Sequence, residues 1–206
     1  MNIRSFIYNF FITFTSNSYA EVLKRLPENT HLLDVGVGTG KPILANAIEI
    51  KLKSIQITGI DIDEDYLKVA QNKIAKAGLS NLVNILHTDI CTSTLPATYD
   101  AVYFSDSFMI IPKSNHLQVL QKVIASLNFY VHKTIYFTQT HEHKHSWVVG
   151  FMKPLLKWFT TINFGQVTYE NDFIKTLDEA GLIIIERKVI YTSKKRAMVL
   201  IAAKAQ

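Results

Sequence analysis

Residues 32–40 read Leu-Leu-Asp-Val-Gly-Val-Gly-Thr-Gly, an apolar run that passes directly into three alternating glycines. The apolar run is typical of a buried parallel strand. The glycines predict a bend on which few side chains are tolerated. Lys41-Pro42 then predicts a helix start, because proline near the first helical position loses no hydrogen bond. A strand, a glycine bend and a helix start together bring backbone N–H groups close to a bound molecule.

The glycine spacing and the acid before it indicate which ligand the bend serves. A dinucleotide-binding loop has the pattern G-x-G-x-x-G and seats a pyrophosphate on a helix N-terminus. Here the pattern is G-x-G-x-G over Gly36, Gly38 and Gly40, and Asp34 stands two residues before it. A carboxylate there repels a pyrophosphate but accepts hydrogen bonds, directly or through water, from an ammonium group. The pattern resembles the first motif of the class I S-adenosylmethionine-dependent methyltransferases, whose cofactor carries an ammonium and a sulfonium. The simpler alternative is a plain three-glycine turn.

Apolar runs that alternate with helical patterns beyond the bend predict an α/β fold. Strands are expected at 32–35, 55–60, 82–86, 99–104 and 134–138, and one helix is expected through Ile43, Leu44, Ala47 and Ile48. This alternation implies a parallel sheet with right-handed crossovers. Residues 182–191 and 197–203 predict an antiparallel hairpin. The resemblance to class I methyltransferases extends over residues 17–203 and implies a Rossmann-like, doubly wound, mostly parallel seven-stranded sheet with a C-terminal antiparallel hairpin.

The composition predicts one globular domain over residues 1–206. Hydrophobic residues make up 48% and charged residues 19%, which argues against wholesale disorder. The net charge is +5 and the pI about 9.2, yet the basic residues are scattered, apart from Lys194-Lys195-Arg196. One cysteine, Cys91, excludes an intrachain disulfide framework and a multi-cysteine metal site. A reducing, cytoplasmic location is expected.

Residues 1–16 form a strongly apolar and aromatic segment that is expected to act as a lid or packing segment. The segment lacks a small-residue cleavage pattern, so a signal peptide fits poorly. It is shorter than the roughly 20 residues that a transmembrane helix needs, and no transmembrane segment is expected. Interfacial contact with a membrane is the alternative.

The resemblance implies which residues hold S-adenosylmethionine at the carboxyl ends of the strands. Asp61, about 20 residues beyond the bend, would accept both ribose hydroxyls, and Ile62 would pack on the adenine. Asp89, helped by the backbone at Ile90, would contact the adenine exocyclic amine. Each acid alone has a simpler interpretation as a cap, whereas their combination with the bend favours the cofactor. The expected cofactor-binding set is Asp34, Gly36, Gly38, Gly40, Asp61, Ile62, Asp89, Ile90 and Ser105.

The methyl acceptor is expected at the ends of the fourth and fifth strands. Asp106 is the best single acid there, as a general base or as an anchor for a cationic amine, and a loop or cap role is the alternative. His141 is the second catalytic candidate, and Tyr19, Ser107 and Trp147 are candidates for substrate binding. Residues 104–108 lack the Asn/Asp-Pro-Pro-Tyr/Phe motif of amino-methyltransferases that act on adenine, cytosine or glutamine. That absence argues against those enzymes and leaves other RNA enzymes open.

Residues 141–168 are expected to form an acceptor-side insertion after the fifth strand. Three alternate histidines, His141, His143 and His145, open it and suggest a metal site, a base or a solvated loop. We favour the solvated loop and expect no metal, because no other ligand cluster stands out. The aromatic stretch 147–164 could cover the acceptor, engage a partner or rest on a lipid surface, and plain packing is its default role.

Three functions remain open on these grounds. The first is S-adenosylmethionine-dependent methyl transfer, by direct displacement, to an O or N atom of a small molecule, amphiphilic molecules included. The second is a methyltransferase directed at RNA or protein, which the pI of about 9.2 supports. The third is a non-catalytic S-adenosylmethionine-binding subunit. We favour the first, because the chain shows no appended nucleic-acid domain.

Overall fold

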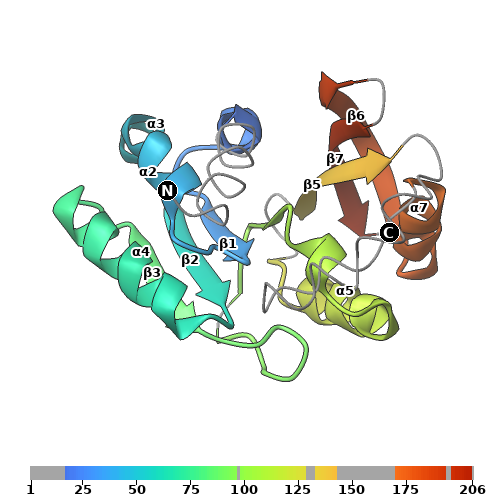
Figure 1. The fold of residues 1–206 in the computed structure, drawn as a ribbon, viewed down its shortest axis with the longest axis horizontal. Coiled ribbons are helices and arrows are strands. Elements are labelled where there is room, and N and C mark those ends of the chain that lie inside the picture. Colours follow the sequence, from blue (N-terminus) through green and yellow to red (C-terminus); the bar gives the residue numbers. More distant parts are fainter. Residues whose placement is uncertain (1–16, 97, 129–132, 143–169, 194–195, 206) are drawn as a thin grey trace, which may run out of the picture.

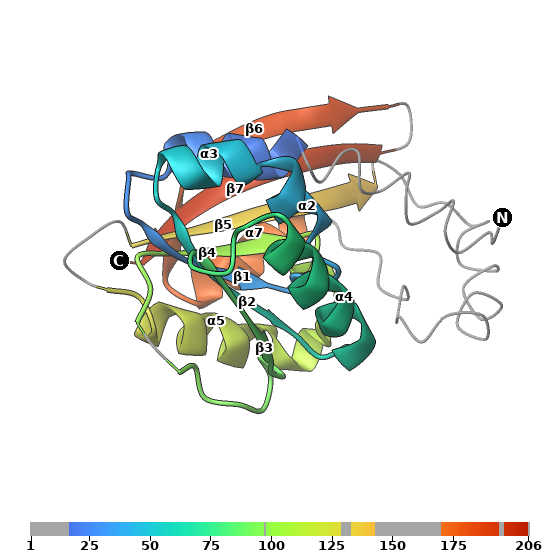
Figure 2. The same cartoon turned by 90° about the vertical axis from the view of Figure 1, so that its left-hand side faces the viewer.

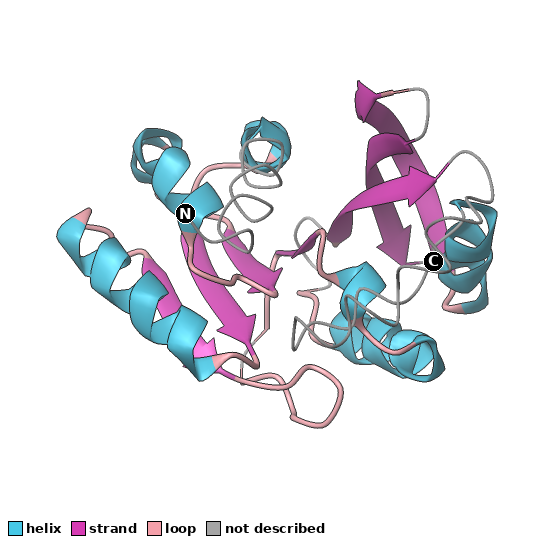
Figure 3. Cartoon of the chain, in the orientation of Figure 1, coloured by secondary structure: helices cyan, strands magenta, loops and turns pink. Residues whose placement is uncertain are grey.

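The computed structural model describes residues 17–96, 98–128, 133–142, 170–193 and 196–205. Figures 1 and 3 show these residues as a sheet with helices on both faces. The strands are β1 (His31–Val35), β2 (Gln56–Asp61), β3 (Val83–His87), β4 (Ala101–Ser105), β5 (Thr134–Glu142), β6 (Leu182–Thr192) and β7 (Arg196–Ala205). The helical elements are a helix over 17–25, α2 (Lys41–Ala45), α3 (Ala47–Leu52), α4 (Glu64–Lys76), α5 (His116–Ala125), α7 (Glu170–Glu179) and the short 3-10 turns η1 (Phe108–Ile110) and η2 (Lys113–Asn115).

The strands run across the sheet in the order β3-β2-β1-β4-β5-β7-β6. β1 pairs in parallel with β2 on one side and with β4 on the other. β7 is antiparallel to both of its neighbours, β5 and β6. The expected doubly wound, mostly parallel seven-stranded sheet with a C-terminal hairpin is therefore confirmed. Because the chain changes direction across the sheet at β1, the carboxyl ends of β1 and β4 border the crevice in which open α/β sheets bind ligands.

Two apolar clusters cover the two faces of the sheet. One packs α5 and α7 against it, and the other packs the helix over 17–25 with α2, α3 and α4, as Figure 2 shows from the side. The first cluster contains Phe104, Phe108, Phe137 and Phe173, whose neighbouring ring centroids lie 5.2–5.7 Å apart. Edge-to-face and stacked rings at such distances give a well-packed core. These rings form a firm base beneath the carboxyl ends of β4 and β5.

The single helix expected after the glycine bend is in fact two short helices. α2 and α3 meet at Asn46, whose side-chain amide donates to the Pro42 carbonyl at 2.8 Å. The Asn46 backbone N–H bonds to Ile43 instead, at 3.1 Å. A side-chain amide that takes a carbonyl competes with the helical ladder. Ile48 lies in α3, within the residues expected to be helical, and its side chain is 77% exposed.

β5 continues beyond the expected strand end at Thr138. His141 and Glu142 extend it, and they pair with Ala197 and Arg196 of β7. An antiparallel partner that supplies hydrogen bonds for these residues explains the extension. The first histidine of the expected loop is therefore part of the sheet, whereas His143, His145 and the rest of the expected insertion lie outside the described residues, as do residues 1–16.

Within the described ranges, no helix has the length and apolar character needed to cross a membrane.

Candidate functional site

The glycine bend is tied to the end of β2 by backbone hydrogen bonds. Gly36 and Val37 both donate to the carbonyl of Ile60, at 2.8 and 3.1 Å. Gly38 donates to Oδ2 of Asp61 at 2.8 Å, and Asp63 donates to Oδ1 at 3.0 Å. Asp61 therefore joins the bend to the end of β2. Because each carboxylate oxygen has more than one acceptor position, Asp61 retains the capacity to bind further donors.

The loop after β4 closes the other side of the bend. Ser107 Oγ donates to the Val35 carbonyl at the end of β1. Gly36 adopts φ +81°, and a Cβ built on it would lie 2.5 Å from Ser107 Cβ. Only glycine combines this backbone conformation with so close a neighbour. Ser107 therefore has a defined structural contact, and its expected contact with substrate stays a prediction.

Asp34 lies at the base of the site and is almost completely buried, with 2% of its surface exposed. Oδ2 accepts a hydrogen bond from Tyr19 Oη at 3.1 Å, while Oδ1 has no hydrogen-bond partner in the described part of the chain. Burial raises the pKa of Asp34 to about 7; the Tyr19 hydrogen bond lowers it and repulsion by Asp61 adds to the rise. Tyr19 is itself fully buried, and it orients the carboxylate. A buried carboxylate with one unused oxygen fits a ligand cation.

The ends of β2 and β3 place one apolar and one acidic group beside Asp61. Ile62 is 68% exposed, so its side chain is available to a ligand. Asp89 lies just beyond β3, where its Oδ1 accepts from the backbone N–H of Cys91 at 2.8 Å. The side chain of Ile90 is buried in the core and its carbonyl accepts a hydrogen bond from Lys122 of α5, which leaves the backbone N–H of Ile90 for contacts at the site.

Lys122, which sequence reasoning missed, fixes the loop that follows Asp89. Lys122 of α5 donates to the carbonyls of Ile90, Cys91 and Ser93 at 2.7, 3.2 and 2.6 Å. An ammonium group that satisfies three carbonyls fixes the path of a loop that has no partner strand. No sequence signal marks this contact, because a lysine on an amphipathic helix usually faces solvent.

One acid, Asp106, and one amide, Gln139, lie at the ends of β4 and β5. Asp106 follows Ser105, the last residue of β4, and adopts φ +55°, which is uncommon for a residue with a side chain. Neither of its carboxylate oxygens has a hydrogen-bond partner among the described residues, and burial raises its pKa to about 7. Gln139 of β5 is fully buried, and sequence reasoning missed it. Ser105 pairs in register with Thr138, the residue before Gln139.

The remaining acceptor candidates are placed as follows. His141 is 3% exposed, and its ring centroid lies 6.1 Å from that of Phe173, so it is packed into the wall behind the site. Trp147 lies outside the described residues. Within the described ranges, no group of three or more His, Cys, Asp or Glu side chains is placed to hold a metal ion.

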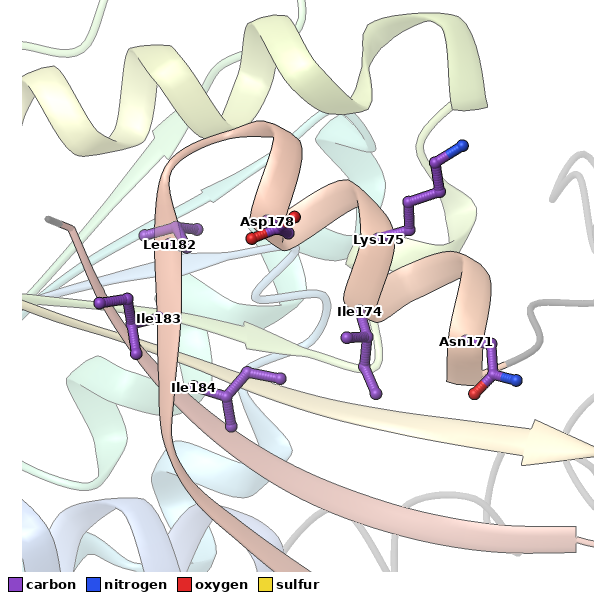
Figure 4. Close-up of a pocket in the computed structure, with 7 residues that line it drawn as sticks. All are labelled: Asn171, Ile174, Lys175, Asp178, Leu182, Ile183 and Ile184. Atoms are coloured by element: carbon purple, nitrogen blue, oxygen red, sulfur yellow. The ribbon is translucent and has the colours of Figure 1, made fainter.

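A separate hollow lies away from this site. Figure 4 shows it between α7 and the first residues of β6. Its lining is Asn171, Ile174, Lys175, Asp178, Leu182, Ile183 and Ile184. The start of β6 pairs with the end of β7, and the end of β7 pairs with the start of β5. The hollow therefore lies at the amino end of β5 and β6, at the edge of the sheet opposite Asp34 and Asp106.

Residues 32–128 match the family model described as "Methyltransferase domain". A protein of Arabidopsis thaliana with the provisional name caffeoyl-CoA O-methyltransferase is 24% identical over 106 residues, which cover 52% of this chain and 45% of that protein. The tRNA1(Val) (adenine(37)-N6)-methyltransferase of Glaesserella parasuis is 30% identical over 77 residues, covering 37% and 32%. The matches thus span less than half the length of these curated relatives.

Two solved structures share the fold at low sequence identity. The [4+2]-cyclase SpnF has a TM-score of 0.70 at 16% identity, with 92% of this chain and 81% of that chain covered. The magnesium protoporphyrin IX methyltransferase of Synechocystis, solved with bound S-adenosylhomocysteine (SAH), has a TM-score of 0.66 at 16% identity, with 94% and 84% covered. The expected class I methyltransferase fold is therefore confirmed, and the presence of a cyclase shows that the fold alone does not identify the reaction.

Proposed function

Because residues 32–128 match the model of the methyltransferase domain family, we propose that this protein is an S-adenosylmethionine-dependent methyltransferase that acts on an O or N atom of a small molecule. The observation that carries this proposal is Asp34, which is 2% exposed and keeps one unused oxygen behind the glycine bend. Burying a carboxylate in this way is costly unless a ligand supplies the missing donor. The ammonium group of S-adenosylmethionine is such a donor.

The described residues fit the rest of this cofactor as well. Asp34 and the glycine bend would hold the methionine end, while Asp61 would accept the ribose hydroxyls. The exposed Ile62 would pack on the adenine, and Asp89 with the Ile90 backbone would face the exocyclic amine. When bound, S-adenosylmethionine supplies a methyl group on a sulfonium that a nucleophile can displace directly. The magnesium protoporphyrin IX methyltransferase of Synechocystis, which shares the fold, has been solved with bound SAH and with bound S-adenosylmethionine, and this supports the assignment.

The contribution of this chain to the chemistry would come from the end of β4. Asp106 would accept a proton from the methyl acceptor or anchor a polar group of it, because it is buried and has no partner in the described residues. Its raised pKa of about 7 suits a group that exchanges a proton near neutral pH. The packed rings of Phe104, Phe108 and Phe137 would hold the end of β4 in place and exclude water from the Asp106 carboxylate. His141, packed on Phe173, is the second candidate for proton transfer.

Replacing Asp61 by asparagine is expected to weaken SAH binding at least tenfold in isothermal titration calorimetry. Asparagine replaces one accepting oxygen by an NH2 group, so a donor would then face the N–H of either Gly38 or Asp63. The NH2 group also cannot accept a hydrogen bond from a ribose hydroxyl. Asp100→Asn is the matched control, because Asp100 also accepts a backbone N–H, from His31 at 2.9 Å, but at the amino end of β1. Equal affinities of wild type and Asp61→Asn would refute the cofactor assignment.

Replacing Lys122 by methionine is expected to weaken SAH binding about fivefold, as expected for the loss of a charged hydrogen-bond donor. S-inosylhomocysteine lacks the exocyclic amine that Asp89 is proposed to contact. Without Lys122 the loop that contains Asp89 loses its hydrogen bonds to α5, so the variant should no longer bind SAH more tightly than S-inosylhomocysteine. Lys53→Met is the control: Lys53 also donates to three carbonyls, those of Leu23, Lys24 and Leu26, away from the site. An unchanged preference in Lys122→Met would contradict this role.

RNA is the second candidate substrate, favoured by the local similarity to a tRNA methyltransferase and by the pI of about 9.2. RNA binding by this chain would weaken steeply with salt, because phosphate contacts release counterions. A screen with radiolabelled S-adenosylmethionine against metabolite, lipid, RNA and protein pools separates the two candidates. Methylated RNA that disappears at high salt would favour the second candidate, and a labelled small molecule the first. Flotation with liposomes tests whether an amphiphilic acceptor brings the protein to a membrane.

A further inference from the structure

Gln139 is an unusual residue at the end of β5. Its side chain is fully buried, and neither Nε2 nor Oε1 has a hydrogen-bond partner among the described residues. A side-chain amide can donate two hydrogen bonds and accept two. Leaving all of them unmade inside a protein is costly, and such a group calls for an explanation. A bound ligand that carries both a hydrogen-bond donor and an acceptor would satisfy this amide and would explain its burial.

The surroundings of Gln139 are aromatic on one side and acidic on the other. Side chains alternate along a strand, so Gln139 shares its face of the sheet with Phe137 and His141. The ring centroid of Phe173 lies 5.2 Å from that of Phe137 and 6.1 Å from that of His141. Gln139 therefore lies on a largely aromatic face of the sheet, which it shares with one other polar side chain, His141.

Asp106 lies just beyond the end of β4, next to the residue pair Ser105 and Thr138 that precedes Gln139. Its backbone N–H donates to the Thr138 carbonyl at 3.0 Å, which places it beside the peptide that leads into Gln139. Its carboxylate oxygens are also without partners in the described residues, and its φ of +55° is a strained conformation for aspartate. These two unsatisfied buried groups, one in β5 and one directly after the neighbouring β4, lie at the ligand-binding edge of the sheet and point to one ligand site.

We infer that Gln139 and Asp106 form the recognition end of the acceptor site and take a neutral group that presents a hydrogen-bond donor beside an acceptor, such as a carboxamide or a hydroxyl. This inference rests on the proposed methyltransferase function. Above pH 7, where Asp106 is ionised, its negative charge repels an anionic group. A purely cationic group would leave the two N–H donors of Gln139 unsatisfied. A neutral group with both functions satisfies the amide and the carboxylate together.

The first test uses the stability of the protein without acceptor. Gln139→Met keeps the side-chain volume and removes the unsatisfied amide, so Tm is expected to rise by about 3 °C. Gln121→Met, a change on the exposed face of α5, is the control and should leave Tm unchanged. A fall in Tm on Gln139→Met would overturn the inference, because it would show that the amide is already satisfied within the protein. Calorimetry with SAH accompanies each variant, and affinity within twofold of wild type is expected.

The second test uses three probes of one shape and different charge: benzamide, benzoate and benzylammonium. Saturation-transfer NMR on the SAH-loaded wild type should detect benzamide and not the two ions, and Gln139→Met should lose the benzamide signal. Asp106→Asn should gain a benzoate signal, because the repelling charge is gone. Benzoate binding to wild type as strong as benzamide binding, or benzamide binding that survives in Gln139→Met, would overturn the inference. Failure of the wild type to bind SAH would instead overturn the proposed function.

Discussion

Replacing Gly36 by alanine is expected to abolish measurable SAH binding and to lower the free energy of unfolding by about 3 kcal/mol or more. The left-handed backbone at φ +81° costs alanine about 1–2 kcal/mol. The new methyl group would also lie 2.5 Å from Ser107 Cβ, a distance that forces the bend and the β4 loop apart. Since Gly36 is bonded to Ile60 and Gly38 to Asp61, the displacement would disrupt the whole bend. Urea unfolding and calorimetry with SAH measure the two effects.

Two further variants separate the conformational cost from the steric one. Gly181 adopts φ +75°, and a Cβ built on it would meet nothing within 4 Å. Gly181→Ala should therefore lose only the conformational part and keep SAH binding. Ser107→Gly removes the clashing atom, so Gly36→Ala combined with Ser107→Gly should recover part of the lost stability as a favourable coupling energy. If Gly36→Ala were no more destabilised than Gly181→Ala, the close approach to Ser107 would have no energetic importance.

The topology and the position of the acids at the carboxyl edge of the sheet were predictable from the sequence because both depend on local patterns. Apolar runs that alternate with helical patterns predict a parallel sheet, and an acid that directly follows such a run must lie at the carboxyl edge. Asp61 is the last residue of β2, and Asp89 lies just beyond the end of the adjacent β3. The same reasoning needs no knowledge of side-chain contacts.

The features that were missed depend on contacts between distant parts of the chain. β5 continues through Glu142 because β7, more than 50 residues later, supplies its hydrogen bonds. Lys122 reaches back to Ile90 from α5, which no periodicity reveals. In the sequence, Gln139 looks like any polar residue of a strand, and only the structure shows that its side chain is fully buried. Asn46 could have been suspected, since asparagine competes with the helical backbone, but the proline carbonyl that it takes is a structural fact.

Asp34→Asn is expected to make the unliganded protein more stable at pH 8 and less able to bind SAH. Burial raises the pKa of Asp34 from 3.8 to about 7. Below pH 4 the carboxyl is protonated in both the folded and the unfolded state, so its ionisation costs the fold nothing. Between pH 4 and 7 the unfolded state ionises first, and stability falls as pH rises. Above pH 7 the full penalty of about 4 kcal/mol is present.

The difference in unfolding free energy between Asp34→Asn and wild type isolates this effect. Asparagine keeps an oxygen for the Tyr19 hydroxyl and carries no charge, so the difference should grow from pH 4 to pH 8 by up to about 4 kcal/mol. Asp106, whose pKa is also raised to about 7, titrates in both proteins, and its contribution cancels. Asp61, the other acid that acts on Asp34, is likewise present in both. Urea unfolding across this pH range provides the measurement, and a constant difference would contradict the raised pKa.

Binding should show the opposite trend, because the ammonium group of SAH favours ionised Asp34. A group that must lose a proton to bind makes the wild-type affinity rise with pH, by at least about tenfold between pH 5.5 and 7.5. The affinity of Asp34→Asn should be lower at pH 7.5 and nearly independent of pH over this range. Titrations in buffers of different ionisation enthalpy should reveal proton release in wild type and none in the variant. Parallel pH profiles of the two proteins would show that Asp34 does not hold the ammonium group. The ionised Asp34 carboxylate therefore destabilises the unliganded protein, and the ammonium group of the cofactor is expected to offset that cost when it binds.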